Sequence, residues 1–147
     1  MICGNGGSAA DSQHLAAELT VRLTRDFVRP GLAALALTTD SSFLTAYSND
    51  FAFEGIFERQ VQALGRPGDV LLAISTSGGS DNVRRAVQAA RQHRITTIGL
   101  LGEGGRLARE VDHAIVIPCR VVAHVQEAML AIEHVICHGV EREVCGG

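Results

Sequence analysis

Leu71–Ser80 reads LLAISTSGGS, and the residues that follow it, Asp81–Val87, read DNVRRAV. The run of aliphatic residues predicts a buried strand, and its abrupt change to hydroxyl residues and glycines predicts a tight loop. A helical pattern starts immediately after that loop. The N-terminus of a helix offers free backbone N–H groups and the positive end of its dipole, which together favour phosphate. This stretch therefore predicts a strand, a phosphate-binding loop and a helix.

The side chains of the loop refine this prediction. Hydroxyl groups that can each donate a hydrogen bond to a phosphate oxygen stand at Ser75, Thr76, Ser77 and Ser80. No lysine follows the glycines, so the loop does not match the nucleotide-binding pattern GxxxxGK[ST]. A serine-rich loop without that lysine fits a sugar phosphate better than a nucleoside triphosphate. The alternative is an ordinary turn in which Ser80 caps the helix.

The composition predicts a single globular domain, residues 1–147. The net charge of −3, without a basic run or an aromatic cluster, argues against nucleic-acid binding. No apolar run approaches the roughly 20 residues that span a bilayer, and no signal-peptide pattern opens the chain. The four cysteines show no paired spacing and are expected to be reduced thiols of a cytoplasmic protein. Glu127 and Glu133 are interpreted as solvated or interface charges.

A second unit of the same kind opens the chain. Ile2–Ser8 reads as the end of a strand and a glycine-rich turn, and a helix with Ser8 as its N-cap is predicted from there to about Arg25. Further strands are expected at 32–37, 69–74, 95–101 and 114–117, and helices at 56–64, 80–93, 107–111 and 121–144. The segment at 38–50 is expected to be irregular, with room for one helical turn at 43–46. This alternation predicts an α/β protein with a doubly wound, five-stranded parallel sheet flanked by helices. Ligands of such sheets lie beyond the carboxyl ends of the strands, so both Gly/Ser loops are expected to line one pocket.

Polar residues recur at helical spacing on two of the predicted helices. His14 and Glu18 are four residues apart, and Gln126 and His134 are eight apart. Two histidines, a carboxylate and the weaker amide oxygen form a reasonable ligand set for zinc or another divalent ion. The same residues could instead be an acid–base pair, or polar side chains at a helix surface. His134 and His138, also four apart, form a rival pair on one helix.

Two further groups of residues are candidates for sugar contacts. Asn49 and Asp50 lie in the loop after the second predicted strand, where a carboxylate can bind sugar hydroxyls, although an Asx-type turn is the simpler interpretation. Asn5, Gly6 and Gly7 allow the backbone to approach a ligand closely. This turn does not match GxGxxG, so it does not predict a dinucleotide site.

Together, the motifs at Cys3–His14 with Glu18 and at Ile74–Ser80 resemble those of the sugar isomerase (SIS) domain, and more narrowly those of the phosphoheptose isomerases. The resemblance covers nearly the whole chain. These enzymes convert sedoheptulose 7-phosphate to D-glycero-D-manno-heptose 7-phosphate in the heptose pathway for cell-envelope polysaccharide. The resemblance implies a homotetramer of doubly wound subunits with active sites at the subunit interfaces. It also implies a family helix before the position of Met1, which this chain is expected to lack.

The resemblance implies a role for each matching residue. Glu18 and His134 would be the acid–base pair. The substrate would be bound by Asn5, Gly6, Gly7, Ser8, Asn49, Asp50, Ser75, Thr76, Ser77, Ser80 and Gln126, with the hydroxyl residues at its phosphate. Zinc would be bound by His14, Glu18, Gln126 and His134. Because a residue that ligates a metal is a poorer base, Glu18 cannot hold both roles without qualification.

One departure from the family pattern lies on the last predicted helix. The family often reads Gln-Glu-Ile-His where this chain reads Gln-Glu-Ala-Met at 126–129, and Met129 removes a polar group that bears on substrate specificity. A second hypothesis is therefore a catalytically inactive phosphosugar-binding regulatory protein, or an adaptor of the replication initiator, as in a paralogous branch of this fold. That branch tends to lack a glutamate at the position of Glu18, so Glu18 favours the isomerase.

Overall fold

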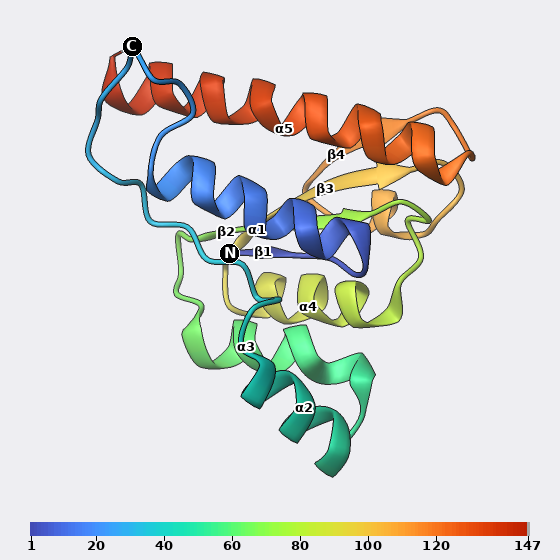
Figure 1. Cartoon of the computed structure of the whole chain (residues 1–147). Helices are drawn as coiled ribbons and strands as arrows, with labels where there is room; N and C mark the ends of the chain where they lie inside the picture. The colour runs from blue at the N-terminus through green and yellow to red at the C-terminus, as the bar shows by residue number, and fades with distance from the viewer. Residues whose placement is uncertain (147) are drawn as a thin grey trace.

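The computed structural model describes residues 1–146, which form a parallel sheet between two layers of helices (Figure 1). The elements in chain order are β1 (Ile2–Cys3), α1 (Gly7–Thr20), α2 (Ser41–Asp50), the short 3₁₀ helix η1 (Phe53–Gly55), α3 (Ile56–Leu64), β2 (Val70–Ser75), α4 (Asp81–Gln92), β3 (Thr96–Gly102), the 3₁₀ helix η2 (Leu107–Arg109), β4 (His113–Ile117) and α5 (Val122–Cys145). The predicted α/β class is confirmed, and the helix predicted at 56–64 has those bounds.

The named strands lie in the order β1-β2-β3-β4 and pair in parallel. The fifth strand predicted at 32–37 is reduced to an isolated parallel bridge between Ala36 and Ile2. Hydrogen bonds run from Ile2 N–H to Leu35 O (2.8 Å) and from Leu37 N–H to Ile2 O (2.9 Å). The predicted five-stranded sheet is therefore corrected to four strands and a bridge, because β1, against which this segment lies, has only two residues to pair with.

The bridge still determines the topology. Counted as an edge of the sheet, the segment around Ala36 lies on one side of β1, whereas β2, β3 and β4 follow on the other side. The path of the chain across the sheet thus reverses between β1 and β2. In doubly wound folds the crevice at such a reversal is where ligands bind, outside the carboxyl ends of the strands.

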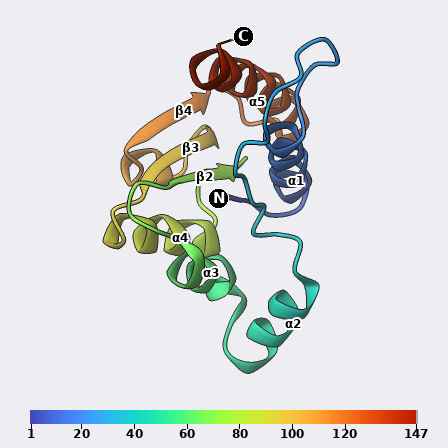
Figure 2. The same ribbon diagram turned by 90° about the vertical axis from the view of Figure 1, so that its left-hand side faces the viewer.

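Helices cover both faces of the sheet. Figures 1 and 2 show α1 and α5 on one face, with α3 and α4 on the other. Leu15 of α1 packs with Val125 and Met129 of α5 in one apolar core. Phe57 of α3 and Val83 of α4 belong to the second core. Burial on both faces explains why the strands read as continuous apolar runs rather than as alternating ones.

Segment 38–50 was predicted to be irregular apart from one helical turn at 43–46, and the structure extends that turn to a helix of ten residues. This helix is α2, whose N-cap carboxylate, Asp40, accepts a hydrogen bond from Phe43 N–H (2.9 Å). None of its residues is fully buried, and only Phe43, Leu44 and Tyr47 pack, half-buried, against the second core, so its apolar pattern is short. Tyr47 stacks between Phe43 and Phe51.

The helix predicted to reach Arg25 ends at Thr20, where Arg29 closes it. The Arg29 guanidinium donates to Glu18 O and Leu19 O, both at 2.8 Å. These carbonyls belong to the last turn of α1 and lack partners within the helix. Arg29 Nε also donates to Glu141 Oε1 on α5 (2.8 Å), with 1% and 4% of the two side chains exposed. The loop after α1 is thereby fastened to both helices.

Candidate active site

The Ser75–Ser80 loop connects β2 to α4 and brings its hydroxyl groups together. Ser75 Oγ lies 3.1 Å from Ser80 Oγ and 3.4 Å from Ser77 Oγ. Ser80 is the N-cap residue of α4, as predicted, but its side chain makes no capping hydrogen bond to that helix. Its hydroxyl instead faces the other serines of the loop. Thr76 lies between them, partly exposed.

The loop keeps this shape because a neighbouring segment supports it from behind. Gly78 has a φ of 60°, and its carbonyl accepts a hydrogen bond from Leu107 N–H (3.1 Å). A Cβ atom at Gly105 would lie 1.9 Å from Gly78 O, and one at Gly102 would lie 1.9 Å from Thr76 O. Only glycine permits so close an approach of two backbones. In the sequence, the glycines after β3 indicated only the end of a strand.

The two Gly/Ser loops meet at the reversal between β1 and β2. Asn5 and Asn82 exchange two side-chain hydrogen bonds of 2.8 Å, which join the first loop to the start of α4. Gly6 and Gly7 are exposed beside this junction. Ser8 was predicted to be the N-cap of α1, but Gly6 holds that position, and Ser8 is buried within the first turn.

The histidines predicted from two separate helices face each other across the α1–α5 contact. His14 Nε2 lies 2.9 Å from His134 Nε2, and the ring planes are 71° apart. Glu18 Oε1 lies 3.9 Å from His14 Nε2. The other oxygen of that carboxylate, Oε2, is buried without a hydrogen-bond partner. His14, Glu18 and His134 are thus brought together, and an unsatisfied carboxylate oxygen lies with them.

The structure gives Gln126 different neighbours. Its Nε2 group donates to Asp11 Oδ2 on α1, and its side chain lies against Gly7. No hydrogen bond joins it to His14 or His134 among residues 1–146. Asp11 was not a predicted site residue. Its spacing of three residues from His14, which places both on one face of α1, was the available signal.

Asn49 and Asp50 are not brought to the two loops. They lie at the end of α2, exposed, and the Asn49 amide donates to the Asp50 carboxylate (2.9 Å). Both views place α2 on the side of the sheet opposite α5 (Figures 1 and 2). The prediction of a loop here is wrong, and no hydrogen bond in the described chain links these two residues to the other candidates.

The donor groups at the α1–α5 contact suit zinc in kind. Two imidazole nitrogens point at each other, and at most one of them can carry a proton in a hydrogen bond between them. A carboxylate oxygen without a partner lies beside them, and these are the usual donors of zinc. Within the described residues, however, no three His, Cys, Asp or Glu side chains are close enough to hold an ion as they stand. Glu18 would have to approach the rings. His138, the alternative ligand, makes no side-chain hydrogen bond or ion pair among residues 1–146.

Glu133 lies on the buried side of α5, so of its two interpretations, a solvated charge or an interface charge, the first is wrong. It is 0% exposed, and neither carboxylate oxygen has a partner. Burial, together with the nearby negative charge of Asp11, raises the pKa of Glu133 to about 8. At neutral pH this carboxyl group is therefore mainly protonated. Met129, one turn earlier, is also fully buried, so the departure from the family pattern lies in the core.

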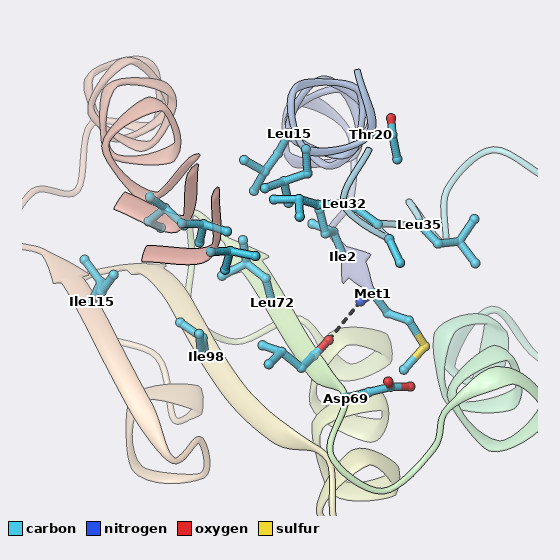
Figure 3. Close-up of a pocket in the computed structure, with 17 residues that line it drawn as sticks. Met1, Ile2, Leu15, Thr20, Leu32, Leu35, Asp69, Leu72, Ile98 and Ile115 are labelled. Atoms are coloured by element: carbon cyan, nitrogen blue, oxygen red, sulfur yellow. Dashed lines mark hydrogen bonds between the residues drawn. The ribbon is translucent and has the colours of Figure 1, made fainter. Parts of the chain in front are cut away.

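A large apolar cavity of about 800 Å³ lies elsewhere (Figure 3). It is lined by Met1, Leu15, Leu32 and Ile98 among others, near the amino ends of β1 and β2, where the N-terminal amine donates to Val70 O (2.8 Å). Its walls are mostly aliphatic, and besides Thr20 it presents the carboxylate of Asp69, which would repel a phosphate. The polar loops at the carboxyl ends of the strands remain the candidate site.

Fold and site together define a class of protein. Residues 1–102 match the family model described as the SIS domain. No helix among residues 1–146 has the length and apolar character needed to cross a membrane.

Similar proteins narrow the class from the SIS domain to one family. A phosphoheptose isomerase of Akkermansia muciniphila is 49% identical over 148 residues, which span 100% of this chain and 77% of the relative. One from Geotalea daltonii is 51% identical over 99% of this chain and 76% of the relative. The structure of phosphoheptose isomerase GmhA from Neisseria gonorrhoeae matches 95% of this chain and 74% of that chain, with a TM-score of 0.87 and 46% identity. The chain belongs to the phosphoheptose isomerase family.

Proposed function

We propose that this protein is an isomerase that converts sedoheptulose 7-phosphate to D-glycero-D-manno-heptose 7-phosphate. One observation carries the proposal: a hydroxyl-rich loop at the N-terminus of α4 is joined to the loop before α1 by Asn5 and Asn82, and α1 carries His14 and Glu18 toward His134. Relatives that are about half identical over the whole chain support it. The reaction would serve the heptose pathway for cell-envelope polysaccharide in the cytoplasm.

The loop at Ser75–Ser80 supplies the binding end of the site. Its hydroxyls and the first N–H groups of α4 can donate to phosphate oxygens, and the helix dipole favours the negative charge. Asn5, Gly6 and Gly7 would contact the sugar next to it, with Ser8 near the phosphate. A phosphate held at this end positions the reacting carbons at the other end and lowers the entropic part of the barrier.

The α1–α5 contact supplies the chemical end. Moving the carbonyl from C2 to C1 requires removal of a proton from C1 and return of a proton to C2, through an enediol. Glu18 can take the first proton as a carboxylate, and His134 can exchange a proton with the neighbouring carbon or oxygen. His14, 2.9 Å from His134, fixes the orientation of that ring.

We propose zinc as the cofactor, held by His14, Glu18, His134 and the amide oxygen of Gln126. A bound zinc ion would polarise the carbonyl and stabilise negative charge on its oxygen. Glu18 and His134 transfer protons only to the extent that the carboxylate and the ring nitrogen are not occupied by the ion. The unpartnered Glu18 Oε2 supports the assignment.

We further propose that the active enzyme is a homotetramer with sites at its subunit interfaces. Asn49 and Asp50, which the family resemblance assigns to the sugar, are exposed on α2. That helix buries none of its residues within its own subunit and carries exposed Phe51. Contact with a neighbouring subunit would cover this aromatic surface.

The test is proton NMR of sedoheptulose 7-phosphate with the purified protein in heavy water, with and without zinc. We expect the aldose to form with deuterium at C2, and Glu18→Gln to lower turnover by ~10²–10⁴-fold. Glu127→Gln, the same change at an exposed position of α5, is the control and should be silent. Light scattering of the same samples reports whether the chain assembles as a tetramer.

Other results would revise this proposal. Turnover by Glu18→Gln within a few-fold of the parent would remove Glu18 from the mechanism. Turnover that is unchanged by added zinc and by chelators would rule out zinc as the cofactor. Binding of the sugar phosphate without any exchange of hydrogen would support a regulatory or adaptor protein instead.

A further inference from the structure

Asp11 is a charged residue that the proposed mechanism does not use. It lies on α1, half-buried, and Oδ2 of its carboxylate accepts a hydrogen bond from Gln126 Nε2 on α5. A carboxylate can only accept hydrogen bonds, whereas a glutamine amide has a donating end and an accepting end. The partner of Asp11 must therefore be the nitrogen end of the amide. Its oxygen end is turned elsewhere.

Gly7 shows where that oxygen lies. A Cβ atom at Gly7 would be 2.7 Å from Gln126 Oε1 and 3.0 Å from its Cδ, so the amide rests on the glycine backbone. No donor in the described chain binds Gln126 Oε1. The amide is thus held at its nitrogen by Asp11 and covered on one side by Gly7. Its carbonyl oxygen is left free at the loop proposed to bind the sugar.

The Asp11–Gln126 contact and the His14–His134 contact both join α1 to α5. Asp11 and His14 are three residues apart on α1, and Gln126 and His134 are eight apart on α5, so each pair shares a face. The 2.9 Å approach of the two rings fixes the spacing of the two helices at the His14–His134 contact. Asp11 therefore meets Gln126 at a defined position beside the proposed site.

We propose that Asp11 is a positioning residue that selects which end of the Gln126 amide faces the ligand. The inference rests on the proposed function and deepens it. A carbonyl oxygen can ligate a divalent cation or accept a hydrogen bond from a sugar hydroxyl, whereas an NH₂ group can do neither. Without Asp11 the amide is free to rotate, and part of its population presents the wrong end.

A double-mutant cycle tests whether Asp11 acts through Gln126. The zinc Kd is measured by competition with a chromophoric chelator for the parent protein, Asp11→Ala, Gln126→Ala and the double variant. We expect Asp11→Ala, which leaves no acceptor at this position, to weaken zinc binding by about 10–100-fold, as the loss of a residue that orients a ligand usually does. We expect no further loss when residue 126 is already alanine. Gln13→Ala, an exposed change on the same helix, is the control and should leave the Kd unchanged. Equal losses in both backgrounds would overturn the proposal, because Asp11 would then act on the ion itself.

A second measurement is independent of zinc and of turnover. The side-chain NH₂ signals of Gln126, assigned by their loss in Gln126→Ala, should lie apart from those of exposed glutamines in a ¹⁵N–¹H spectrum. Asp11→Ala should move them to the exposed positions while the backbone signals of α5 stay in place. If they do not move, the proposal is overturned. If the parent protein neither binds zinc nor exchanges the sugar, the proposed function fails, and this spectrum still decides the role of Asp11.

Discussion

Two glutamates on the buried face of α5, eight residues apart, have opposite hydrogen-bonding environments. Glu141 accepts hydrogen bonds from Leu23 N–H (3.1 Å) and from Arg29 Nε (2.8 Å). Glu133 has no partner for either oxygen. The Leu23 N–H bond and then Arg29 hold the pKa of Glu141 below its usual range, although burial acts against them. Burial raises the pKa of Glu133 to about 8.

The difference shows that partners, rather than depth, decide the charge state of a buried carboxylate. Both side chains are almost inaccessible, at 3% and 0% of the residue surface. Desolvation penalises the ionised form at both positions, and only Glu141 receives donors that offset it. Glu141 fastens the loop after α1, whereas Glu133 is retained at a cost to stability beside the proposed site. Residues kept at such a cost are frequent at functional sites.

Breaking the paired carboxylate should have the largest effect. Glu141→Gln leaves the buried Arg29 guanidinium without its counter-charge, and we expect a loss of about 3–5 kcal/mol in the free energy of unfolding at pH 7. Because the folded-state pKa is lowered, the contribution of Glu141 is present above its ordinary pKa of 4.5. This contribution is lost as the pH falls through the lowered folded-state pKa of Glu141. The destabilisation caused by Glu141→Gln is expected to disappear over the same pH range. Urea denaturation at pH 7 and in acid measures both; a penalty that persists in acid would contradict the pairing.

The same substitution at the unpaired position should act in the opposite direction. The unfolded chain ionises Glu133 near its ordinary pKa of 4.5, whereas the folded chain holds the proton up to about 8. Stability therefore falls between these pH values and then levels off. Glu133→Gln removes this dependence and should stabilise the metal-free protein by roughly 1–3 kcal/mol above pH 8, with little gain below pH 4.5. Urea midpoints across this range test it, with Glu127→Gln as the control. A loss of stability at all pH values would mean that Glu133 has a partner.

A charge-conserving change sharpens the comparison and should have the smallest effect. Arg29→Lys keeps the positive charge near Glu141 but loses the planar group that also donates to Glu18 O and Leu19 O. We expect a loss of about 1–2 kcal/mol, close to the value of one or two hydrogen bonds. The exposed Arg85→Lys is the matched control and should be neutral. A loss of stability as large as that of Glu141→Gln would show that the planar guanidinium of Arg29, rather than its charge, holds the loop.

Local signals predicted the parts of the site that are continuous in sequence. The change from aliphatic residues to hydroxyls and glycines at Ile74–Ser80 predicted the end of β2, the loop and the start of α4, because each of these follows from neighbouring residues. The first loop was predicted for the same reason. The N-cap of α1 was misplaced by two residues, since Gly6 as well as Ser8 suits that position.

Features that depend on packing were missed or misplaced. The strand at 32–37 shrank to one bridge because its neighbour β1 is short, and only one turn of α2 was predicted because that helix fully buries no side chain. Glu133 was interpreted as a solvated or interface charge because its identity suggests exposure, whereas its position on the stripe of Val125, Met129 and Cys137 buries it.

The sequence by itself determined the α/β class, the two loops and the candidate residues of the site, because strand, turn and helix signals and side-chain chemistry are local. Only the tertiary structure decided which of those residues meet. Helical spacing places His14 with Glu18 on one helix, but the 2.9 Å contact with His134, 120 positions away, depends on how α1 and α5 pack on the same face of the sheet. The same packing gave Glu141 its partners and left Glu133 without any, because the donors that reach α5 come from a loop beyond the end of α1.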